Sequence, residues 1–252
     1  MSDHLIVSHD EWLAARRRLL EEEKAFTSRR DALSARRREM PWERIEKDYR
    51  FVGPKGELSL ADLFDGRAQL VVYHFMLGPD WENGCKSCSF WADNFNGIDV
   101  HLAHRDVTLA AVSRAPFVKI EAFKKRMGWS FAWVSSFGSD FNYDFQASFA
   151  PADLAKGEVF YNFKLQKMSI DETPGISVFT RDGEGAVFHT YSCYQRGLDM
   201  LNGAYHFLDL TPKGRDEDAL PFTMSWLRHH DRYDTPTWGA RGPFVRDFTR
   251  RT

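Results

Sequence analysis

Two cysteines, Cys85 and Cys88, are the residues of this sequence best suited to chemistry. They follow an apolar run at 70–77, which reads as a buried strand, and a turn that begins at Gly78. A Cys-x-x-Cys pair at the start of the next helix is typical of a redox centre. The unpaired amides and the positive dipole end of a helix N-terminus stabilise a thiolate, the nucleophile of disulfide exchange. We therefore expect Cys85 to attack a disulfide and Cys88 to resolve the mixed disulfide.

Three further residues bear on this pair. Lys86 lies between the two cysteines, where its cation is expected to favour the thiolate. For His74, on the preceding strand, two interpretations stay open: a buried proton acceptor near the sulfurs, or a hydrogen-bonded core histidine, which is the commoner case. The third cysteine, Cys193, is expected to be a buried small residue.

Length and composition bound the class of protein. A chain of 252 residues with 43% apolar residues can bury a core as one domain with elaborations. A formal charge of −2 provides no field that would recruit nucleic acid or an anionic membrane. The polar first residues lack a signal-peptide pattern, and no apolar run reaches membrane-spanning length. We therefore expect a soluble, cytoplasmic protein without a nucleic-acid or membrane partner.

The first 46 residues are expected to form a helical arm. Ser8 and Glu11 have the spacing of a capping box, which places a helix start near residue 9. Large apolar residues then recur every seven positions, a pattern that aligns one narrow stripe along the helix. Arginine runs on this helix alternate with acidic residues, so we interpret them as a solvated face. The stripe suits packing on a globular body or on a second copy, and a homodimer through this helix is expected; its members are Trp12, Leu19, Phe26, Leu33 and Met40.

The order of elements over 47–215 predicts the fold. A hairpin near 49–60 precedes a strand at 70–77, a helix from Cys85, a strand at 107–112 and a helix at 117–127. Two strands joined by a hairpin follow at 175–180 and 186–191, and then a helix near 197–207. This order predicts an α/β, thioredoxin-like fold: a central mixed sheet flanked by helices. Residues 216–252 are expected to form a C-terminal extension, with a short helix near 222–230 and an irregular tail.

Residues 137–173 interrupt this order with an aromatic-rich insertion that has no sustained period. Either it seals one end of the sheet, or it forms a lid over Cys85. In the second interpretation the insertion residues Phe141 and Tyr143 line a substrate pocket together with Trp81 and Trp91. In thioredoxin-like folds a loop proline, often cis, precedes the first antiparallel strand and packs beside the sulfurs. The pair Thr173 and Pro174 stands at that point, so we assign Thr173 to substrate binding and Pro174 to the catalytic set; an ordinary trans turn proline is the alternative.

Several segments resemble a thioredoxin-like family of mainly bacterial proteins catalogued as a domain of unknown function. The most specific is residues 84–93, Gly-Cys-Lys-Ser-Cys-Ser-Phe-Trp-Ala-Asp, preceded by Tyr-His-Phe-Met-Leu-Gly-Pro-Asp-Trp at 73–81. The resemblance covers nearly the whole chain and implies a fold of the thioredoxin superfamily, but it implies no reaction. The family usually has proline after the first cysteine, where this chain has Lys86, and Thr or Ser at the place of Cys193.

Two other chemistries were weighed for the same cysteines. A peroxiredoxin needs Pro-x-x-x-Thr/Ser-x-x-Cys, but here Glu82 stands three residues before Cys85 and Pro79 stands six before it, so an ordinary peroxiredoxin is not expected. His101 and His104 complete a near match to a zinc-finger spacing with the two cysteines. The two histidines are one residue too close, and a strand of an α/β run precedes the pair, so no metal is expected.

The expected function is a thiol–disulfide oxidoreductase with no cofactor beyond a redox-active Cys85–Cys88 disulfide. Its partner would be a disulfide-containing small molecule or protein. The alternative is a non-catalytic protein that keeps the fold and holds a small ligand, a metal or a partner.

Overall fold

The computed structural model describes residues 4–233, and the chain divides into two units, residues 1–43 and 44–252. The first unit is built on one long helix, α1 (His9–Arg38). The predicted capping box at its start is confirmed, because the Ser8 side chain accepts from the Glu11 amide and the Glu11 carboxylate accepts from the Ser8 amide at 3.0 Å. No residue of α1 is buried, and all five apolar residues of the stripe, which recur every seven positions, are exposed.

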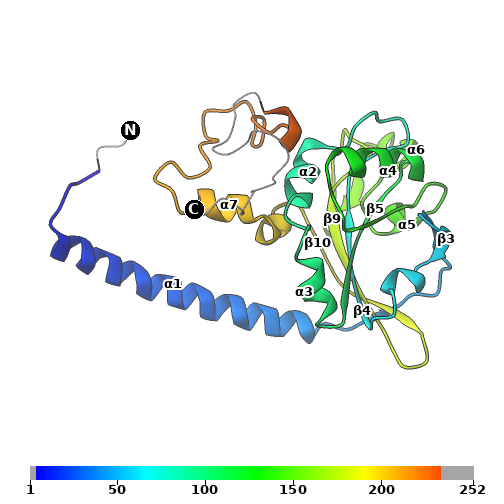
Figure 1. The fold of residues 1–252 in the computed structure, drawn as a ribbon, viewed down its shortest axis with the longest axis horizontal. Helices are drawn as coiled ribbons and strands as arrows, with labels where there is room; N and C mark the ends of the chain where they lie inside the picture. Colours follow the sequence, from blue (N-terminus) through cyan, green and yellow to red (C-terminus); the bar gives the residue numbers. More distant parts are fainter. Residues whose placement is uncertain (1–3, 234–252) are drawn as a thin grey trace, which may run out of the picture. The chain divides into compact units, whose positions relative to one another are not determined.

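The second unit is organised around an eight-stranded mixed sheet (Figure 1), with the order β1-β10-β9-β4-β5-β6-β2-β3. The central strand β4 (Gln69–His74) runs parallel to β5 (Val107–Ser113) and antiparallel to β9 (Gly175–Arg181). A parallel β4-helix-β5 unit next to an antiparallel β9–β10 hairpin is the thioredoxin arrangement, so the predicted fold class is confirmed. The other strands are β1 (Glu43–Arg44), β2 (Arg50–Gly53), β3 (Gly56–Ser59), β6 (Ala132–Ser135) and β10 (Val187–Tyr194).

Strand β6 was not predicted. It pairs in parallel with β5, from Ala110 opposite Ala132 to Ser113 opposite Ser135, and it joins the core sheet to the predicted β2–β3 hairpin. The helices of the second unit are short: α2 (Lys86–Ala92), α3 (Asp99–Ala103), α4 (Phe117–Arg126), α5 (Phe141–Asp144), α6 (Pro151–Leu154) and α7 (Gly203–Leu208), with 3-10 turns η1 (Asp62–Phe64), η2 (Gln195–Leu201) and η3 (His230–Arg232).

The two faces of the sheet carry separate cores, because successive strand residues point to opposite sides. Along β4, Tyr73 faces one core with Cys88 and Trp91 of α2. Leu70 and Val72 face the other core, which holds Phe141 from the insertion. The alternation along β4 therefore decides which of its residues can reach the cysteines.

The aromatic insertion contains α5, α6 and a separate two-stranded sheet, β7 (Val159–Tyr161) with β8 (Lys164–Gln166). Its hairpin packs on Tyr194 of β10 in a third, small core that also contains Phe149 and Tyr161. The insertion therefore contributes Phe141 to the core that holds Leu70 and Val72, and Phe149 and Tyr161 to the small core at Tyr194.

The predicted helix near 222–230 is wrong. This segment consists of turns followed by η3, and it is held by tertiary contacts: Leu227 is fully buried, and the Glu217 carboxylate accepts from the Met224 amide and from the Trp226 indole N–H. Met224 takes a left-handed φ of 65°, which ends any helix there. The predicted irregular tail from 234 onward lies outside the described residues. Among the helices of residues 4–233, none has the length and apolar character needed to span a membrane.

Candidate thiol redox site

Cys85 lies at the N-cap of α2, where the chain turns away from β4. The turn is fixed by the Cys85 amide, which donates to the Met76 carbonyl at 3.0 Å, and by Ser89, whose amide and hydroxyl both donate to the Cys85 carbonyl at 2.9 Å. The preceding residue must be small, because a side-chain carbon at Gly84 would lie 2.7 Å from the rings of Phe75 and Phe123. The predicted position of the pair at a helix start is confirmed.

The surroundings of Cys85 favour its thiolate. Its pKa is lowered to about 6, mainly by a hydrogen bond from the Cys88 thiol and further by the backbone amides of Cys88 and Ser87 and the Ser87 hydroxyl, against the opposing effect of burial. A thiol with this pKa is mostly ionised at pH 7. Cys85 keeps partial exposure, so the thiolate is accessible.

Cys88 is the opposite kind of thiol. It is 1% exposed, its sulfur accepts from the Met76 amide at 3.4 Å, and burial raises its pKa well above the ordinary value, with the neighbouring Cys85 raising it further. Cys85 and Cys88 are not joined by a disulfide in this structure, and Cys193 is buried as predicted. The pair therefore combines an acidic, accessible thiol with a buried, protonated one.

Tyr73 is the third member of the site, and sequence reasoning missed it. Its side chain is 1% exposed, and its hydroxyl has no hydrogen-bond partner of ordinary geometry among the described residues. The hydroxyl still lies close enough to Cys88 for each group to shift the pKa of the other; burial, first, and Cys88, second, raise the pKa of Tyr73. The available signal was the alternation of Tyr73 and His74 on β4, which does not say which residue faces the cysteines.

A cavity of about 350 Å³ opens at Cys88. Its walls combine α2 and β4 with three distant segments: the residue before β9, the η2 turn and the C-terminal segment 216–233. The structure thus brings together three of the predicted residues, Cys88, Trp91 and Pro174. The full lining is Tyr73, Ser87, Cys88, Trp91, Pro174, Gln195, Arg196, Leu198, Asp199 and Met224.

The bond between Thr173 and Pro174 is trans, since no peptide bond between described residues is cis, so the cis expectation is wrong. The position is held from the insertion: the Thr173 hydroxyl donates to the Gln146 carbonyl at 3.0 Å, and the Tyr161 hydroxyl donates to the Pro174 carbonyl at 3.3 Å. These contacts fix Pro174 at the cavity wall, while Thr173 is buried and faces away into the insertion.

The other predicted pocket residues lie elsewhere. Trp81 packs over Gly78 at the edge of the cysteine-side core and does not line the cavity. Phe141 is fully buried in the opposite core. Tyr143 contacts Arg114, whose guanidinium also pairs with the buried Glu172. The insertion therefore contributes to the site through Tyr161, which holds Pro174, and the predicted pocket wall of Phe141 and Tyr143 is wrong.

His74 does not modulate the sulfurs. It is fully buried on the face of β4 opposite Tyr73, its Nε2 lies 2.9 Å from the Ser177 hydroxyl, and its ring stacks on Phe141. Burial, helped by His189, lowers its pKa to about 3, which keeps it neutral. The core interpretation is therefore correct. Lys86 is exposed, and the groups that lower the Cys85 pKa most are those of Cys88 and Ser87.

The C-terminal segment contributes contacts that the sequence did not suggest. The Gly84 carbonyl, next to Cys85, lies 2.8 Å from His229 Nε2. Arg126 of α4 holds this segment through His229 Nδ1 at 3.0 Å and Asp231 at 2.9 Å. Met224 of the same segment lines the cavity. The segment therefore covers the N-terminal end of α2.

No group of three or more histidine, cysteine or acidic side chains is arranged to hold a metal among residues 4–233. The zinc set of Cys85, Cys88, His101 and His104 is thus not assembled, because the histidines belong to α3 and the residue after it.

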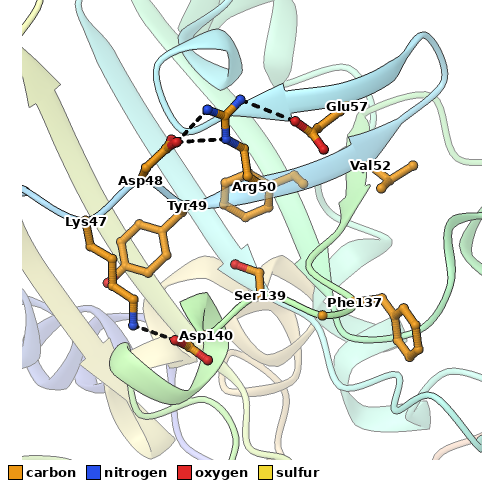
Figure 2. Close-up of a pocket in the computed structure, with 11 residues that line it drawn as sticks. Lys47, Asp48, Tyr49, Arg50, Val52, Glu57, Phe137, Ser139 and Asp140 are labelled. Carbon is orange, nitrogen blue, oxygen red and sulfur yellow. Dashed lines mark hydrogen bonds and ion pairs between the residues drawn. The ribbon is translucent and has the colours of Figure 1, made fainter.

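A second cavity, also of about 350 Å³, lies beside the β2–β3 hairpin and is shown in Figure 2. Its charged side chains pair with one another: Lys47 with Asp140 at 2.7 Å, and Arg50 with both Asp48 and Glu57. It contains no cysteine or histidine. The cavity at Cys88 is therefore the one associated with redox-capable groups.

Comparisons with known proteins give one family match. The family model described as "Bacterial protein of unknown function (DUF899)" matches residues 1–233. No curated protein matches. Similar solved structures include the Xanthomonas campestris bacterioferritin comigratory protein, whose structure was described for its alkyl peroxide reduction activity (12% identity, TM-score 0.43, 66% of this chain and 96% of that chain), and peroxidoxin BcpB from Mycobacterium tuberculosis (14% identity, TM-score 0.39, 64% and 93%). These scores are too low to support an inference, so the fold assignment rests on the strand order and connectivity above.

Proposed function

We propose that this chain, which belongs to the bacterial family of unknown function DUF899, is a thiol–disulfide oxidoreductase that uses Cys85 and Cys88. The family assignment agrees with the resemblance carried by the Gly-Cys-x-Ser-Cys-Ser-Phe-Trp motif. The observation that carries the proposal is the contrast within the pair: the accessible Cys85 has a pKa lowered to about 6, and the adjacent Cys88 is buried with a raised pKa.

The reaction follows from this contrast. The Cys85 thiolate attacks one sulfur of a disulfide R–S–S–R′, so that a Cys85–S–R bond forms, the R–S–S–R′ bond breaks and R′S⁻ leaves. Cys88 then loses its proton and attacks the Cys85 sulfur, forming the Cys85–Cys88 disulfide and releasing RS⁻. Starting from the Cys85 thiolate, the protein gives up two electrons and the one proton of Cys88, and the substrate becomes two thiolates, which take up protons from water as their own pKa values require. An external thiol reductant returns the pair to its reduced state.

The same geometry orders the two steps. Before the first attack, Cys88 is kept protonated by burial and by the Cys85 thiolate beside it. Once Cys85 is part of a mixed disulfide, its charge is gone and one cause of the raised Cys88 pKa disappears. Cys88 is therefore easier to ionise once the mixed disulfide has formed, when its attack is needed, than before.

We assign a disulfide substrate in preference to a peroxide. The residue three positions before Cys85 is Glu82, an exposed carboxylate, and a carboxylate cannot supply the hydroxyl that peroxiredoxins place there. The proposal also includes a cytoplasmic location and a homodimer through α1. Four apolar stripe residues of α1, and Met40 just after it, are 46–67% exposed and spaced as in paired helices. Phe26→Glu would then reduce the mass measured by sedimentation to that of one chain; an unchanged mass would refute this dimer.

The test is single-turnover oxidation of the reduced protein by glutathione disulfide, with free thiols counted over time and the disulfide located by mass spectrometry. We expect two thiols to be lost as a Cys85–Cys88 disulfide forms. Cys88→Ser should stop at a mixed disulfide on Cys85, and Cys85→Ser should form neither product. Cys193→Ser, a buried cysteine outside the pair, is the matched control and should behave as the unmodified protein. The proposal fails if no Cys85–Cys88 disulfide forms, or if neither substitution changes the reaction.

A further inference from the structure

We propose that the cavity at Cys88 binds the neutral, apolar group of a small organic disulfide and that the Tyr73 hydroxyl holds a hydrogen-bonding atom of that group. This inference rests on the proposed function and names its substrate class. A small neutral disulfide is thereby favoured over a charged one and over a disulfide on a protein surface.

The walls of the cavity are mainly apolar. The side chains of Trp91, Pro174, Leu198 and Met224 face it from four separate segments. Burying an apolar group against such walls is favourable by roughly 25 cal/mol for each Å² removed from water. The cavity therefore suits an aryl or alkyl group.

The charged residues at the cavity are already paired. The Asp199 carboxylate accepts from Arg196 at 2.7 Å and from Arg215 at 3.1 Å, and Arg215 is also paired with Asp209 at 2.8 Å. A charged substrate would have to compete with these ion pairs or lose its hydration without compensation. A neutral substrate meets neither cost.

Tyr73 supplies a polar anchor. Its side chain lines the cavity, and its buried hydroxyl lacks a hydrogen-bond partner of ordinary geometry among the described residues, which is unfavourable for a buried polar group. Burial keeps the phenol protonated, so it can donate to an acceptor atom on the ligand. A ligand with one acceptor would satisfy this group, and a purely apolar one would not.

The size of the cavity suits a small organic group. Its volume of about 350 Å³ is near the lower end of the range for pockets that hold small organic ligands. Two flanking segments limit it: the insertion, through the Tyr161 hydroxyl bond to the Pro174 carbonyl, and the C-terminal segment, through Met224. In the mixed disulfide on Cys85, the R group would occupy this cavity while Cys88 attacks the Cys85 sulfur and RS⁻ leaves.

The first experiment measures single-turnover rates of the reduced protein with two disulfides, neutral 4,4′-dithiodipyridine and cationic cystamine. Each rate is divided by the rate at which the same disulfide reacts with dithiothreitol, which removes differences in intrinsic reactivity. We expect the normalised rate to be at least tenfold higher for the neutral disulfide. Leu198→Phe, which fills the cavity, should lower the dithiodipyridine rate about tenfold and reduce the ratio of the two rates. Leu210→Phe makes the same change at a residue 82% exposed and is the matched control.

The second experiment separates binding from redox chemistry. The Cys85→Ser/Cys88→Ser protein is titrated with 4-phenylpyridine, a neutral aromatic with one acceptor, by calorimetry. We expect saturable binding that weakens at least fivefold with Tyr73→Phe, whereas Tyr49→Phe, a buried tyrosine in the opposite core, should leave it unchanged.

The outcomes distinguish the two proposals. If glutathione disulfide oxidises the pair but 4-phenylpyridine does not bind and Leu198→Phe has no selective effect, this inference is overturned and the proposed function stands. If 4-phenylpyridine binds but no disulfide reacts with Cys85, the proposed function is overturned, and with it the assignment of the ligand as a substrate.

Discussion

Tyr73 and His74 are adjacent on β4, yet only one of them belongs to the site. Both are buried to 1% exposure or less, and each has one polar atom without a hydrogen-bond partner among the described residues, the Tyr73 hydroxyl and His74 Nδ1. Burial shifts the pKa of both, raising that of Tyr73 and lowering that of His74 to about 3. By burial and pKa alone the two residues are equally good candidates.

Their surroundings separate them. Tyr73 lines a cavity and interacts with Cys88, whereas the His74 ring packs against those of Phe141 and Phe145. Its Nε2 lies 2.9 Å from the Ser177 hydroxyl, which in turn lies 3.0 Å from that of Ser192. A perturbed pKa marks a functional site only when the group also reaches a reactive atom and a space for a ligand. The comparison therefore teaches that the face of β4, and not the degree of burial, decides the role.

Replacing Cys85 should remove the activity, whereas replacing His74 should not. Cys85→Ser should lower the rate of single-turnover disulfide reduction more than 100-fold, because the other cysteines, Cys88 and Cys193, are buried. His74→Leu, one residue from Tyr73 but on the other face, should change that rate less than twofold. Circular dichroism melts would confirm that both variants are folded. An equal loss in both variants would show that the two faces of β4 are functionally coupled.

Cys85, on the Tyr73 side of β4, and His74 should change the stability of the protein in different pH ranges. Alkylation of Cys85 by iodoacetamide should rise with a midpoint near pH 6 and fall about tenfold per pH unit below it. The folded pKa of Cys85 is below its ordinary value of 9.0, so its thiolate stabilises the reduced protein fully above pH 9, and this stabilisation is lost as the pH falls to about 6.

His74 loses its contribution in a lower window. The pKa of His74 is about 3 in the folded protein and 6.5 in its ordinary state, so between these pH values the unfolded chain takes up a proton that the folded protein does not. The free energy of unfolding therefore falls as the pH drops from 6.5 towards 3. Urea denaturation of the reduced protein from pH 4 to 9 measures both effects. Cys85→Ser should reduce the slope above pH 6, and His74→Leu should reduce the slope below pH 6.5, where the raised pKa of Glu172, about 7, changes the stability in the opposite direction in every variant. A pH profile unaffected by either variant would contradict both pKa shifts.

The local sequence carried the redox pair and the order of the core elements. Cys85 and Cys88 stand at a helix start because an apolar run ends, a turn containing Gly84 follows, and helical residues come next, all within twenty positions. Strand β6 was not predicted because it has only four residues, with Trp133 and Val134 as its large apolar members and no alternating pattern. Its pairing with β5 determines it, and this pairing is not visible locally.

The walls of the cavity could not be predicted for the same reason. Pro174, Leu198 and Met224 come from three segments that meet α2 only in the folded chain, and the contact of His229 with Gly84 joins residues 145 positions apart. The aromatic residues Phe141 and Tyr143 looked suited to a pocket by type. They pack elsewhere because α5 lies on the far face of the sheet, where Phe141 meets Phe51 and Tyr49.

A smaller effect tests whether the His74 side is purely structural. Ser177→Ala removes the partner of His74 Nε2 and leaves a second buried polar atom on that ring unpaired, so it should cost about 1–3 kcal/mol of unfolding free energy. In the His74→Leu background the same substitution should cost less, because no ring nitrogen is then left unpaired. Denaturant titrations of the two single variants and the double variant measure this coupling, and strictly additive costs would show that the hydrogen bond contributes nothing.

Replacing Lys86, the residue after Cys85, should change the stability only slightly. Lys86 is the first residue of α2, a position that tolerates proline because its amide has no partner within the helix. The preceding Cys85 has φ −58° and ψ 132°, the conformation that a residue before proline prefers. Lys86→Pro should therefore stabilise the reduced protein slightly, by about 0.4–1 kcal/mol, through the unfolded chain.

The same substitution also removes the Lys86 charge, and this separates two accounts of the acidity of Cys85. The amides of Cys88 and Ser87 and the Cys88 thiol remain in place, so the midpoint of alkylation should stay near pH 6 in Lys86→Pro, whereas Ser87→Ala, which removes a hydroxyl that lowers the pKa, should move it upward. Iodoacetamide kinetics from pH 4.5 to 8 compare the two variants directly. A larger upward shift in Lys86→Pro than in Ser87→Ala would mean that the exposed lysine, and not the hydrogen bonds around the sulfur, makes Cys85 the attacking thiol.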